Sequence, residues 1–277
     1  MSADRATRGA PRGTAEDAAG EPTGRADDEA IAALRRFDTP TVCNGLELLH
    51  PESRLAGYTD RTLELACAGP IRAEGGPRAV CGRALTARIR SRDASPHPAD
   101  ARSAIKADWY EHVASGGPGS IVVVEDLDDE PLGAFWGEVH TALHRALGAA
   151  GAVTNGVVRD LDDLDPDFFL AGGRVAPSHA HVHWVDFGRG ATVFGMAVAD
   201  GDVVHADRHG AVVVPEHAVA RLPEAIAEVQ AREARVLEIA RAEGPVDLAA
   251  LRALVGAAPA SVAAKAGAPL GTTERAR

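Results

Sequence analysis

Hydrophobic residues in the first part of the chain recur with helical spacing. The segment DDEAIAALRRFD has an acidic start followed by Ile31, Leu34 and Phe37 on one side, which predicts a helix. The next segment, TPTVCNGLELL, predicts a second helix, because Pro40 stands at its beginning and its apolar residues share one face. The segment AVCGRALTARIRS then alternates like a strand, over 80–89.

The middle of the chain changes from strand to helix and back to strand. A helix after Pro98 runs to the GGPG turn, and the β-branched run SIVVVEDL after it predicts a buried strand. GEVHTALHRALGAAG predicts a helix with Val139, Leu143 and Leu147 on one face. AVTNGVV, residues 152–158, predicts the next strand. A strand, helix and strand in this order favour a parallel crossover.

The last third of the chain contains short strands and then helices. VHWVDF, ATVFGMAV and GAVVVP read as strands separated by turn dipeptides such as DG and HG. A long helix is predicted from Glu216 to about Glu243, with Leu222, Ile226, Val229 and Val236 facing inward, and VDLAALRALVG predicts a short one. The pattern predicts a single mixed α/β domain over 27–257.

Both ends of the chain lack a hydrophobic period. Residues 1–26 and 258–277 are rich in Gly, Ala, Pro, Thr and charge, so we expect a disordered N-terminal tail and a flexible C-terminal tail. The formal net charge of -11 argues against nucleic acid as a partner. No apolar run is long enough to span a membrane, and the N-terminus lacks the apolar core of a signal peptide. Three cysteines without CxxC spacing read as reduced thiols, so we expect a cytoplasmic protein.

The strand over 152–158 ends abruptly in a cation and a carboxylate, Arg159 and Asp160. Glu138 opens the helix that precedes this strand, so a strand-helix-strand unit can bring all three residues to one edge of the sheet. Arg can grip a carboxylate through two hydrogen bonds, and Asp is a hard oxygen ligand for Mg²⁺ or Mn²⁺. The alternative is structural: Asp160 caps the next turn and Arg159 pairs with Glu138.

Two further groups of polar residues have a functional and a structural interpretation. His179, His181 and His183 alternate, so on a strand they would share a face and could hold a metal, but imidazoles at a strand edge or a subunit contact are the favoured interpretation. The acidic run VEDLDDEP is interpreted as a solvated loop, although binding loops also occur after strands.

Four segments together resemble the RraA-like family. They are PGSIVVVED, GAFWGEVHTALHRALGAAGAVTNGVVRD, AGGRVAPSHAHVHWVDFG and GMAVADGDVVHADRHGAVVVP, which occur in the order in which the family has them. That family includes 4-hydroxy-4-methyl-2-oxoglutarate aldolases, which also decarboxylate oxaloacetate, and the regulator of ribonuclease E activity. The resemblance implies a swivelling β/β/α domain with mixed sheets and flanking helices, assembled as a homotrimer or homohexamer with sites near subunit contacts.

The resemblance also implies roles for single residues. In the aldolases an acidic residue is followed, after a fixed spacer, by Arg-Asp, and here twenty residues separate Glu138 from Arg159. Arg159 would then bind the pyruvyl carboxylate, Asp160 would hold Mg²⁺ or Mn²⁺ largely through waters, and Glu138 would orient or deprotonate a water beside the metal. Backbone amides of the turn that precedes the helix would line the pyruvyl end: Gly133, Ala134, Phe135, Trp136 and Gly137. Characterised aldolases carry Asp where this chain has Glu138.

The resemblance therefore implies a metal-dependent lyase that releases pyruvate from a 2-oxo acid. The lysine count supports the metal route independently, because a Schiff-base aldolase needs a lysine in its pocket. The two lysines are Lys106, on a predicted helix far from Arg159 in sequence, and Lys265, in a predicted tail. The alternative is a non-catalytic regulator that binds another protein, like the inhibitor of ribonuclease E, because one fold can carry both functions.

Overall fold

The described part of the chain forms a mixed α/β body. The computed structural model describes residues 26–72 and 78–256. The predicted tails lie outside these ranges except for Ala26, whose carbonyl oxygen accepts a hydrogen bond of 2.7 Å from Nη2 of Arg83. Among the described residues, no helix combines the length and the apolar character that a membrane crossing requires.

The centre of the fold is an eight-stranded mixed sheet. Its order is β1-β7-β5-β3-β2-β12-β13, and β9 also pairs with β2. The pairs within β2-β3-β5-β7 are parallel, whereas β1, β9, β12 and β13 join by antiparallel pairing. The strands are β1 (Glu64–Ala68), β2 (Val80–Arg90), β3 (Ser120–Asp126), β5 (Ala149–Thr154), β7 (Phe169–Gly172), β9 (His183–Phe187), β12 (Val203–Asp207) and β13 (Gly210–Val214).

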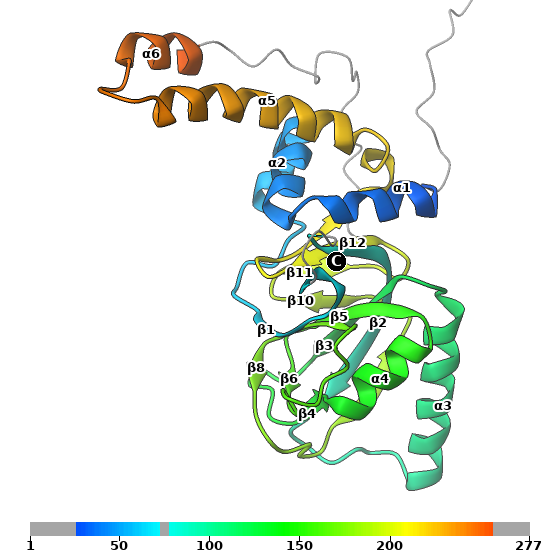
Figure 1. The fold of residues 1–277 in the computed structure, drawn as a ribbon. Coiled ribbons are helices and arrows are strands. Elements are labelled where there is room, and N and C mark those ends of the chain that lie inside the picture. The colour runs from blue at the N-terminus through cyan, green and yellow to red at the C-terminus, as the bar shows by residue number, and fades with distance from the viewer. Residues whose placement is uncertain (1–25, 73–77, 257–277) are drawn as a thin grey trace, which may run out of the picture.

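The described residues form six α-helices; five of them surround the sheet, and α6 lies against α5 (Figure 1). The helices are α1 (Asp28–Ala33), α2 (Thr39–Leu49), α3 (Ala99–Ser115), α4 (Glu138–Ala146), α5 (Leu222–Arg241) and α6 (Leu248–Gly256), with 3-10 turns η1 (Leu34–Arg36), η2 (Pro51–Leu55), η3 (Gly69–Arg72) and η4 (Glu216–Ala218). Helices α1, α2 and α5 lie at one end of the sheet, and α3 and α4 lie along its side (Figure 1). The predicted strand-helix-strand crossover is confirmed as β3, α4 and β5, with β3 and β5 parallel.

The strand predicted over 152–158 is in fact two strands in two sheets. β5 ends at Thr154, and β6 (Val157–Val158) belongs to a three-stranded sheet with β4 (Ala134–Trp136) and β8 (Arg174–Val175). Asn155 explains the break. Its side-chain oxygen accepts a hydrogen bond from the Asp126 amide, and its side-chain nitrogen donates to the Asp126 carbonyl. The side chain therefore replaces the backbone pairing with β3, and the backbone is free to leave that sheet.

ATVFGMAV, predicted as one strand, also divides in two. It forms the hairpin of β10 (Ala191–Val193) and β11 (Met196–Val198). Gly195, at the turn, has a φ of 80°, a conformation that glycine adopts without steric cost. β2 differs from prediction in another way. Its residues are buried almost without alternation, because β2 lies in the middle of the sheet with elements on both faces.

The predicted apolar faces of two helices are only partly buried. On α4, Val139 is 69% exposed, and the buried positions are Thr141 and His144. The polar face can be buried because its groups are satisfied: the Thr141 hydroxyl, for example, donates to the Gly137 carbonyl at 3.1 Å. On α5, Leu222 and Ile226 are buried as predicted, but Val236 is 36% exposed, because the second half of the helix extends beyond the sheet (Figure 1).

Candidate functional site

The junction between β4 and α4 brings together the residues that the sequence singled out. Gly137 is the N-cap of α4, and its backbone is extended. A Cβ atom at Gly137 would lie 2.5 Å from Oδ2 of Asp160 and 3.2 Å from Cγ of Arg159. Only glycine therefore fits here without displacing one of these side chains. We call Gly137, Glu138, Arg159 and Asp160 the Arg159 rim.

Asp160 turns its carboxylate toward the beginning of α4. Its backbone has a φ of 54°, a left-handed conformation that Asp tolerates better than most residues. Oδ2 of Asp160 accepts a long hydrogen bond, 3.4 Å, from the Glu138 amide. The Asp160 carbonyl accepts a 3.0 Å bond from the Asp163 amide, so the backbone also closes the following turn. Asp160 thus places a negative charge at the positive end of a helix.

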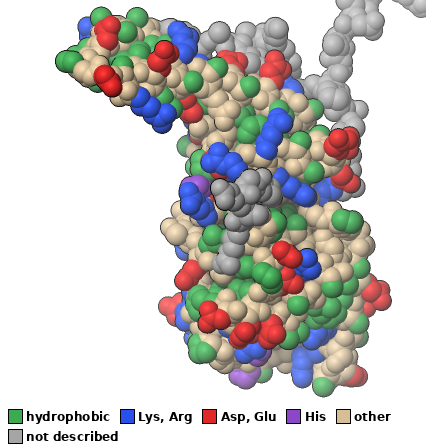
Figure 2. All heavy atoms as spheres, viewed as in Figure 1, with side chains coloured by type: hydrophobic (Ala, Val, Ile, Leu, Met, Phe, Trp, Pro, Cys, Tyr) green, Lys and Arg blue, Asp and Glu red, His purple; other side chains and the backbone are tan. Residues whose placement is uncertain are grey.

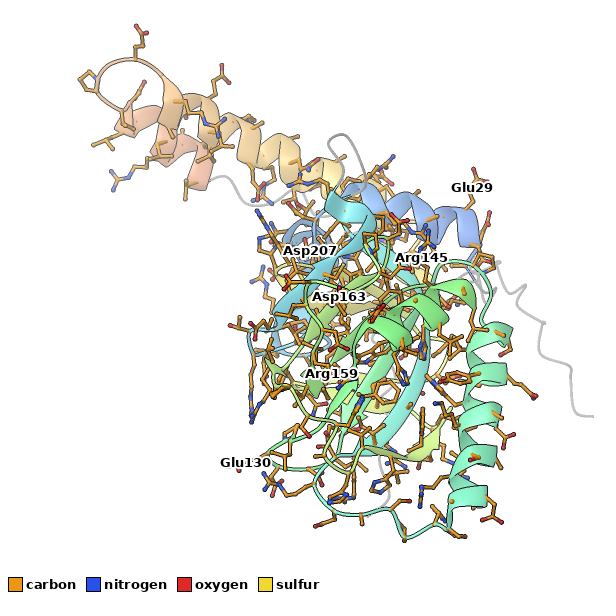
Figure 3. The ribbon with its side chains drawn as sticks, turned by 60° about the horizontal axis from the view of Figure 1, so that its bottom comes forward. Glu29, Glu130, Arg145, Arg159, Asp163 and Asp207 are labelled. Atoms are coloured by element: carbon orange, nitrogen blue, oxygen red, sulfur yellow. The ribbon has the colours of Figure 1, made fainter. Side chains whose placement is uncertain are left out.

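Arg159, labelled in Figure 3, directly follows β6 and precedes Asp160 in the chain. Its amide donates to the Trp136 carbonyl at 2.9 Å, which extends the β4–β6 pairing up to the rim. Its Nε lies 3.2 Å from Oδ2 of Asp160, so the two side chains form an ion pair. The Nε–H is nevertheless buried without a well-aligned hydrogen bond, and Nη1 donates to the Pro177 carbonyl at 3.5 Å. The guanidinium group is therefore held in place but keeps hydrogen-bonding capacity for a ligand.

Glu138 and the first turn of α4 supply further polar groups. The side chain of Glu138 is exposed, and no ion pair between Glu138 and Arg159 occurs within the described residues. The first hydrogen bond within the helix runs from the Thr141 amide to the Gly137 carbonyl. The amides of Val139 and His140 therefore have no acceptor inside the helix. The sequence interpretation expected backbone amides at this helix start to favour an anionic ligand, but it named those of residues 133–137 and not these two.

The other residues predicted to line the site are buried or contact the loop before β9, and so hold the site in position. The Ala134 amide donates to the Ser178 carbonyl at 2.8 Å, and Gly133 is so close to the His179 carbonyl that a Cβ would lie 2.0 Å from that oxygen. Phe135 and Trp136 are buried. The segment 133–137, predicted as a turn, is strand β4 with one glycine on either side. Gly137 contacts Asp160, while residues 133 and 134 contact the loop before β9.

An aromatic cluster lies beneath the rim. The ring centroids of Phe135 and His140 are 4.4 Å apart, and those of Trp136 and His144 are 4.7 Å apart. Burial lowers the pKa of His140 to about 3, and nearby positive charges, among them Lys106 and Arg159, act in the same direction. Burial also lowers the pKa of His144 to about 4. Both imidazoles are therefore neutral at pH 7.

The histidine group does not share a strand face. His179 and His181 precede β9, and only His183 belongs to it. Their Nδ1 atoms are used locally: His179 donates to the Ala134 carbonyl at 2.9 Å, and His183 donates to the His181 carbonyl at 2.8 Å. Across residues 26–72 and 78–256, no group of three or more His, Cys, Asp or Glu side chains could hold a metal ion. The three-histidine metal site is therefore contradicted.

The acidic run after β3 is not simply a solvated loop. Asp126 is 2% exposed, and burial raises the pKa of its carboxyl group. Asp128 accepts hydrogen bonds of 2.8 Å from the amides of Ser91 and Arg92 and forms an ion pair with Arg90. These two carboxylates connect the end of β3 to the end of β2, and Asp129 and Glu130 are the exposed part of the run.

Comparisons with known proteins give a consistent family and fold. The model of the family described as RraA-like, Aldolase/RraA, matches residues 39–213, more than half of the chain. An uncharacterised protein from Pseudomonas syringae pv. tomato matches with a TM-score of 0.60 and 18% identity, covering 85% of this chain and 99% of its own.

A second solved structure has the same fold. Streptomyces coelicolor RraAS2, described as an unusual member of the RNase ES inhibitor RraA family, matches with a TM-score of 0.56 and 22% identity, covering 77% of this chain and 96% of its own. No curated protein matches the sequence significantly. At these identities the solved structures show the fold alone.

Proposed function

Because the chain belongs to the RraA-like (Aldolase/RraA) family, we propose that the Arg159 rim is the site of a divalent-metal-dependent lyase, which cleaves a C–C bond of a 2-oxo acid and releases pyruvate. The observation that carries the proposal is the arrangement of Arg159 and Asp160 against Gly137, where a cation with spare donors and a carboxylate meet the start of a helix. The family includes both lyases and inhibitors, so the activity itself is our proposal.

Arg159 would bind the carboxylate at the pyruvyl end of the substrate. A guanidinium group offers donors in a planar fork that matches a carboxylate, and the Arg159 side chain is 31% exposed, so a substrate carboxylate can reach it. The amides of Val139 and His140 would donate to the same end of the substrate, because the N-terminus of a helix favours anions. These contacts would fix the orientation of the bond that breaks.

The rim has the donor chemistry that suits Mg²⁺ or Mn²⁺ bound mainly through water. Magnesium usually keeps several waters and binds through one or two carboxylates together with its substrate, so it does not need a cage of three protein ligands. Asp160 would hold the ion, and Glu138, one residue beyond Gly137, would hold a water beside it. When bound, such an ion supplies Lewis-acid stabilisation for developing enolate charge.

The proposed reaction needs one bond to break and one proton to be returned. In oxaloacetate, the bond between C3 and the adjacent carboxylate breaks, CO₂ leaves, and the electron pair becomes the enolate of pyruvate. In a 4-hydroxy-2-oxo acid, the hydroxyl proton is lost, the C3–C4 bond breaks, and a carbonyl product forms beside the same enolate. Glu138 would accept or relay that proton through a water, and C3 is protonated to give pyruvate.

The open position of the rim fits a site near a subunit contact. The side chains of Arg159 and Asp160 are 31% and 33% exposed, so solvent reaches the rim of one chain. Exposed apolar side chains occur on the neighbouring elements, with Val139 69% exposed and Leu161 44% exposed. A second copy of the chain could cover them and exclude water. We therefore propose a homotrimer or homohexamer, to be checked by light scattering.

The direct test is pyruvate release from oxaloacetate and from 4-hydroxy-4-methyl-2-oxoglutarate. We expect activity with Mg²⁺ or Mn²⁺ that EDTA abolishes. Arg159→Ala should lower kcat/KM on the order of ten- to hundredfold, because a charge-assisted hydrogen bond contributes about 1.5–3 kcal/mol. Arg159→Lys should recover only part of the loss, because an ammonium group cannot form the two-pronged contact.

Arg241→Ala is the matched control, because Arg241 is exposed at the end of α5 and far along the chain from the rim. It should retain wild-type activity. If wild-type protein with Mg²⁺ or Mn²⁺ released no pyruvate from either substrate, or if Arg159→Ala retained full activity, the lyase proposal would be wrong.

The alternative function, a protein-binding regulator resembling the inhibitor of ribonuclease E, is not better supported. An acidic surface on this chain would suit a basic partner protein. Figure 2, however, shows Asp and Glu interspersed with Lys and Arg on the face in view. A binding protein also has no need for the spare donors of Arg159. A pull-down that recovered a ribonuclease from an extract, together with failure of the pyruvate assay, would reverse this preference.

A further inference from the structure

A second group of cations lines a cavity between α3 and the start of β9. The cavity has a volume of about 270 Å³, room for several water molecules at about 30 Å³ each. Arg102 and Lys106 enter it from α3, one helical turn apart, and His97 and His183 also line it. No Asp or Glu side chain is among the residues that line this cavity. In a chain with 40 acidic and 29 basic residues, such a lining runs against the overall composition.

The cations of the cavity have hydrogen-bond donors available for a ligand. Nη1 of Arg102 donates to the His97 carbonyl at 2.8 Å, which holds the guanidinium group and leaves its other N–H groups available. The ammonium group of Lys106 lies 5.7 Å from the ring centroid of Tyr110. His183 is only 7% exposed, and its Nδ1–H donates to the His181 carbonyl, which leaves Nε2 for another partner.

The ring of Trp184 forms part of the cavity wall. Its indole Nε1–H is buried and has no hydrogen-bond partner within the described part of the chain, so it lies behind the surface that the cavity presents. Arg102 and Lys106 therefore supply the donors that a ligand can reach, and Trp184 is placed to report on the occupied cavity through its fluorescence.

We propose that this cavity binds a small oxyanion, a phosphate or a carboxylate group, through Arg102 and Lys106. An oxyanion fits because its oxygens accept hydrogen bonds, and these two groups only donate them. The proposal does not depend on lyase activity at the Arg159 rim. The anion can come from two sources: a free anion such as phosphate, or the far carboxylate of a dicarboxylate whose other end is held at Arg159.

The test is calorimetric titration of the whole chain with inorganic phosphate and, separately, with 2-oxoglutarate, at constant ionic strength. We expect saturable binding of phosphate that weakens at least about tenfold in Arg102→Ala/Lys106→Ala, because two charge-assisted contacts are lost. Arg232→Ala/Arg241→Ala removes the same charge from the exposed face of α5 and should bind phosphate like wild type. Tryptophan fluorescence gives a second readout: a phosphate-dependent change should disappear in Trp184→Phe.

The response of 2-oxoglutarate to Arg102→Ala/Lys106→Ala distinguishes the two sources. If the cavity takes a free anion only, this double variant should weaken phosphate and leave 2-oxoglutarate bound at the rim unchanged. If the cavity takes the far end of a dicarboxylate, Arg102→Ala/Lys106→Ala and Arg159→Ala should each weaken 2-oxoglutarate, and Arg159→Ala should leave phosphate unchanged. The proposal is overturned if neither ligand binds saturably to the wild type at millimolar concentration. It is also overturned if Arg102→Ala/Lys106→Ala binds phosphate as tightly as the control Arg232→Ala/Arg241→Ala does. Because these measurements report binding, a failed pyruvate assay would not affect them.

Discussion

The Arg159 rim and the α3–β9 cavity each present cations, but they are built in different ways. Arg159 and Lys106 both help to lower the pKa of His140, so the two regions act on one imidazole. At the rim, the cation follows a short strand, contacts a carboxylate and packs against a glycine that has no room for a side chain. In the cavity, the cations belong to α3, whose buried residues, Trp109 and Val113, lie in its second half.

This difference predicts how each region responds to change. A rim defined by close contact should lose function when a single methyl group is added, because neighbouring atoms must move. A cavity lined by exposed side chains should tolerate their removal and lose only the ligand. Three experiments on the folded chain test this difference between the rim and the cavity.

The largest effect is expected from Gly137→Ala. The added methyl group would lie 2.5 Å from Oδ2 of Asp160, so the carboxylate must move. We expect activity of the rim to fall on the order of a hundredfold, because a displacement of about 1 Å can cost that much. Overpacking should also lower the free energy of unfolding by about 1–3 kcal/mol. Pyruvate release and urea unfolding measure the two effects.

Gly57→Ala is the control for this experiment. Gly57 has a φ of 91°, so alanine there is strained, but a Cβ at Gly57 would meet no atom within 4 Å. The free energy of unfolding of Gly57→Ala should fall by about 1 kcal/mol or more, while pyruvate release is retained. Equal activity of the two variants would show that Gly137 is not needed for close contact at the rim.

The next effect is a loss of stability in mild acid that arises from buried histidines, among them those beneath the rim, and not from the cavity. Burial lowers the pKa of His144 to about 4, and its hydrogen bonds fit only the neutral ring: Nδ1 donates to the His140 carbonyl, and Nε2 accepts from Trp109. The unfolded chain therefore binds protons that the folded chain does not, so stability is complete above about pH 6.5 and falls as the pH drops toward 4.

Each such histidine should cost about 2 kcal/mol on going from pH 7 to pH 5. Burial lowers the pKa of His205 to about 4 as well, so it contributes in the same direction. The measurement is urea unfolding at pH 7, 6 and 5. His97→Gln, in the lining of the cavity, should leave the pH dependence as in wild type, whereas His205→Gln should reduce it. An unfolding free energy that stayed constant from pH 7 to pH 5 would contradict the burial of neutral imidazoles.

The smallest effect is expected from Arg102→Ala/Lys106→Ala on stability. Both side chains are exposed, and exposed substitutions usually change the free energy of unfolding by less than about 0.5 kcal/mol. Thermal unfolding without added anion should therefore match wild type. Addition of phosphate should raise the melting temperature of wild type only, because a ligand that binds the folded state stabilises it. A large loss of stability without ligand would show that the cavity is a packing element instead.

The sequence predicted the strand-helix-strand crossover and the approach of Glu138 to Asp160. It predicted the strand break and the buried helix face less well. β-branched runs and an acidic helix start indicated β3, α4 and β5, and the structure joins Glu138 and Asp160 through an amide-carboxylate contact. The break at Asn155 was not predictable, because it depends on a side chain that pairs with the backbone of another strand. The exposure of Val139 was missed because periodicity does not tell which face of a helix meets the sheet.

The α3–β9 cavity shows a second limit of sequence analysis. Arg102 and His183 are about eighty positions apart, and no local pattern joins them. Lys106, which seemed far from Arg159 along the sequence, acts on the same imidazole in the fold. Contacts of this kind are set by how α3 lies on the sheet, which local propensity does not determine.

The most direct test of the central claim is calorimetric titration with oxalate, a planar dianion that resembles the enolate of pyruvate, in the presence of Mg²⁺. If Arg159 is the carboxylate clamp of the site, oxalate should bind saturably to wild type and to Arg241→Ala, and on the order of ten- to hundredfold more weakly to Arg159→Ala. Equal oxalate affinity in wild type and Arg159→Ala would contradict the assignment of the Arg159 rim as the site.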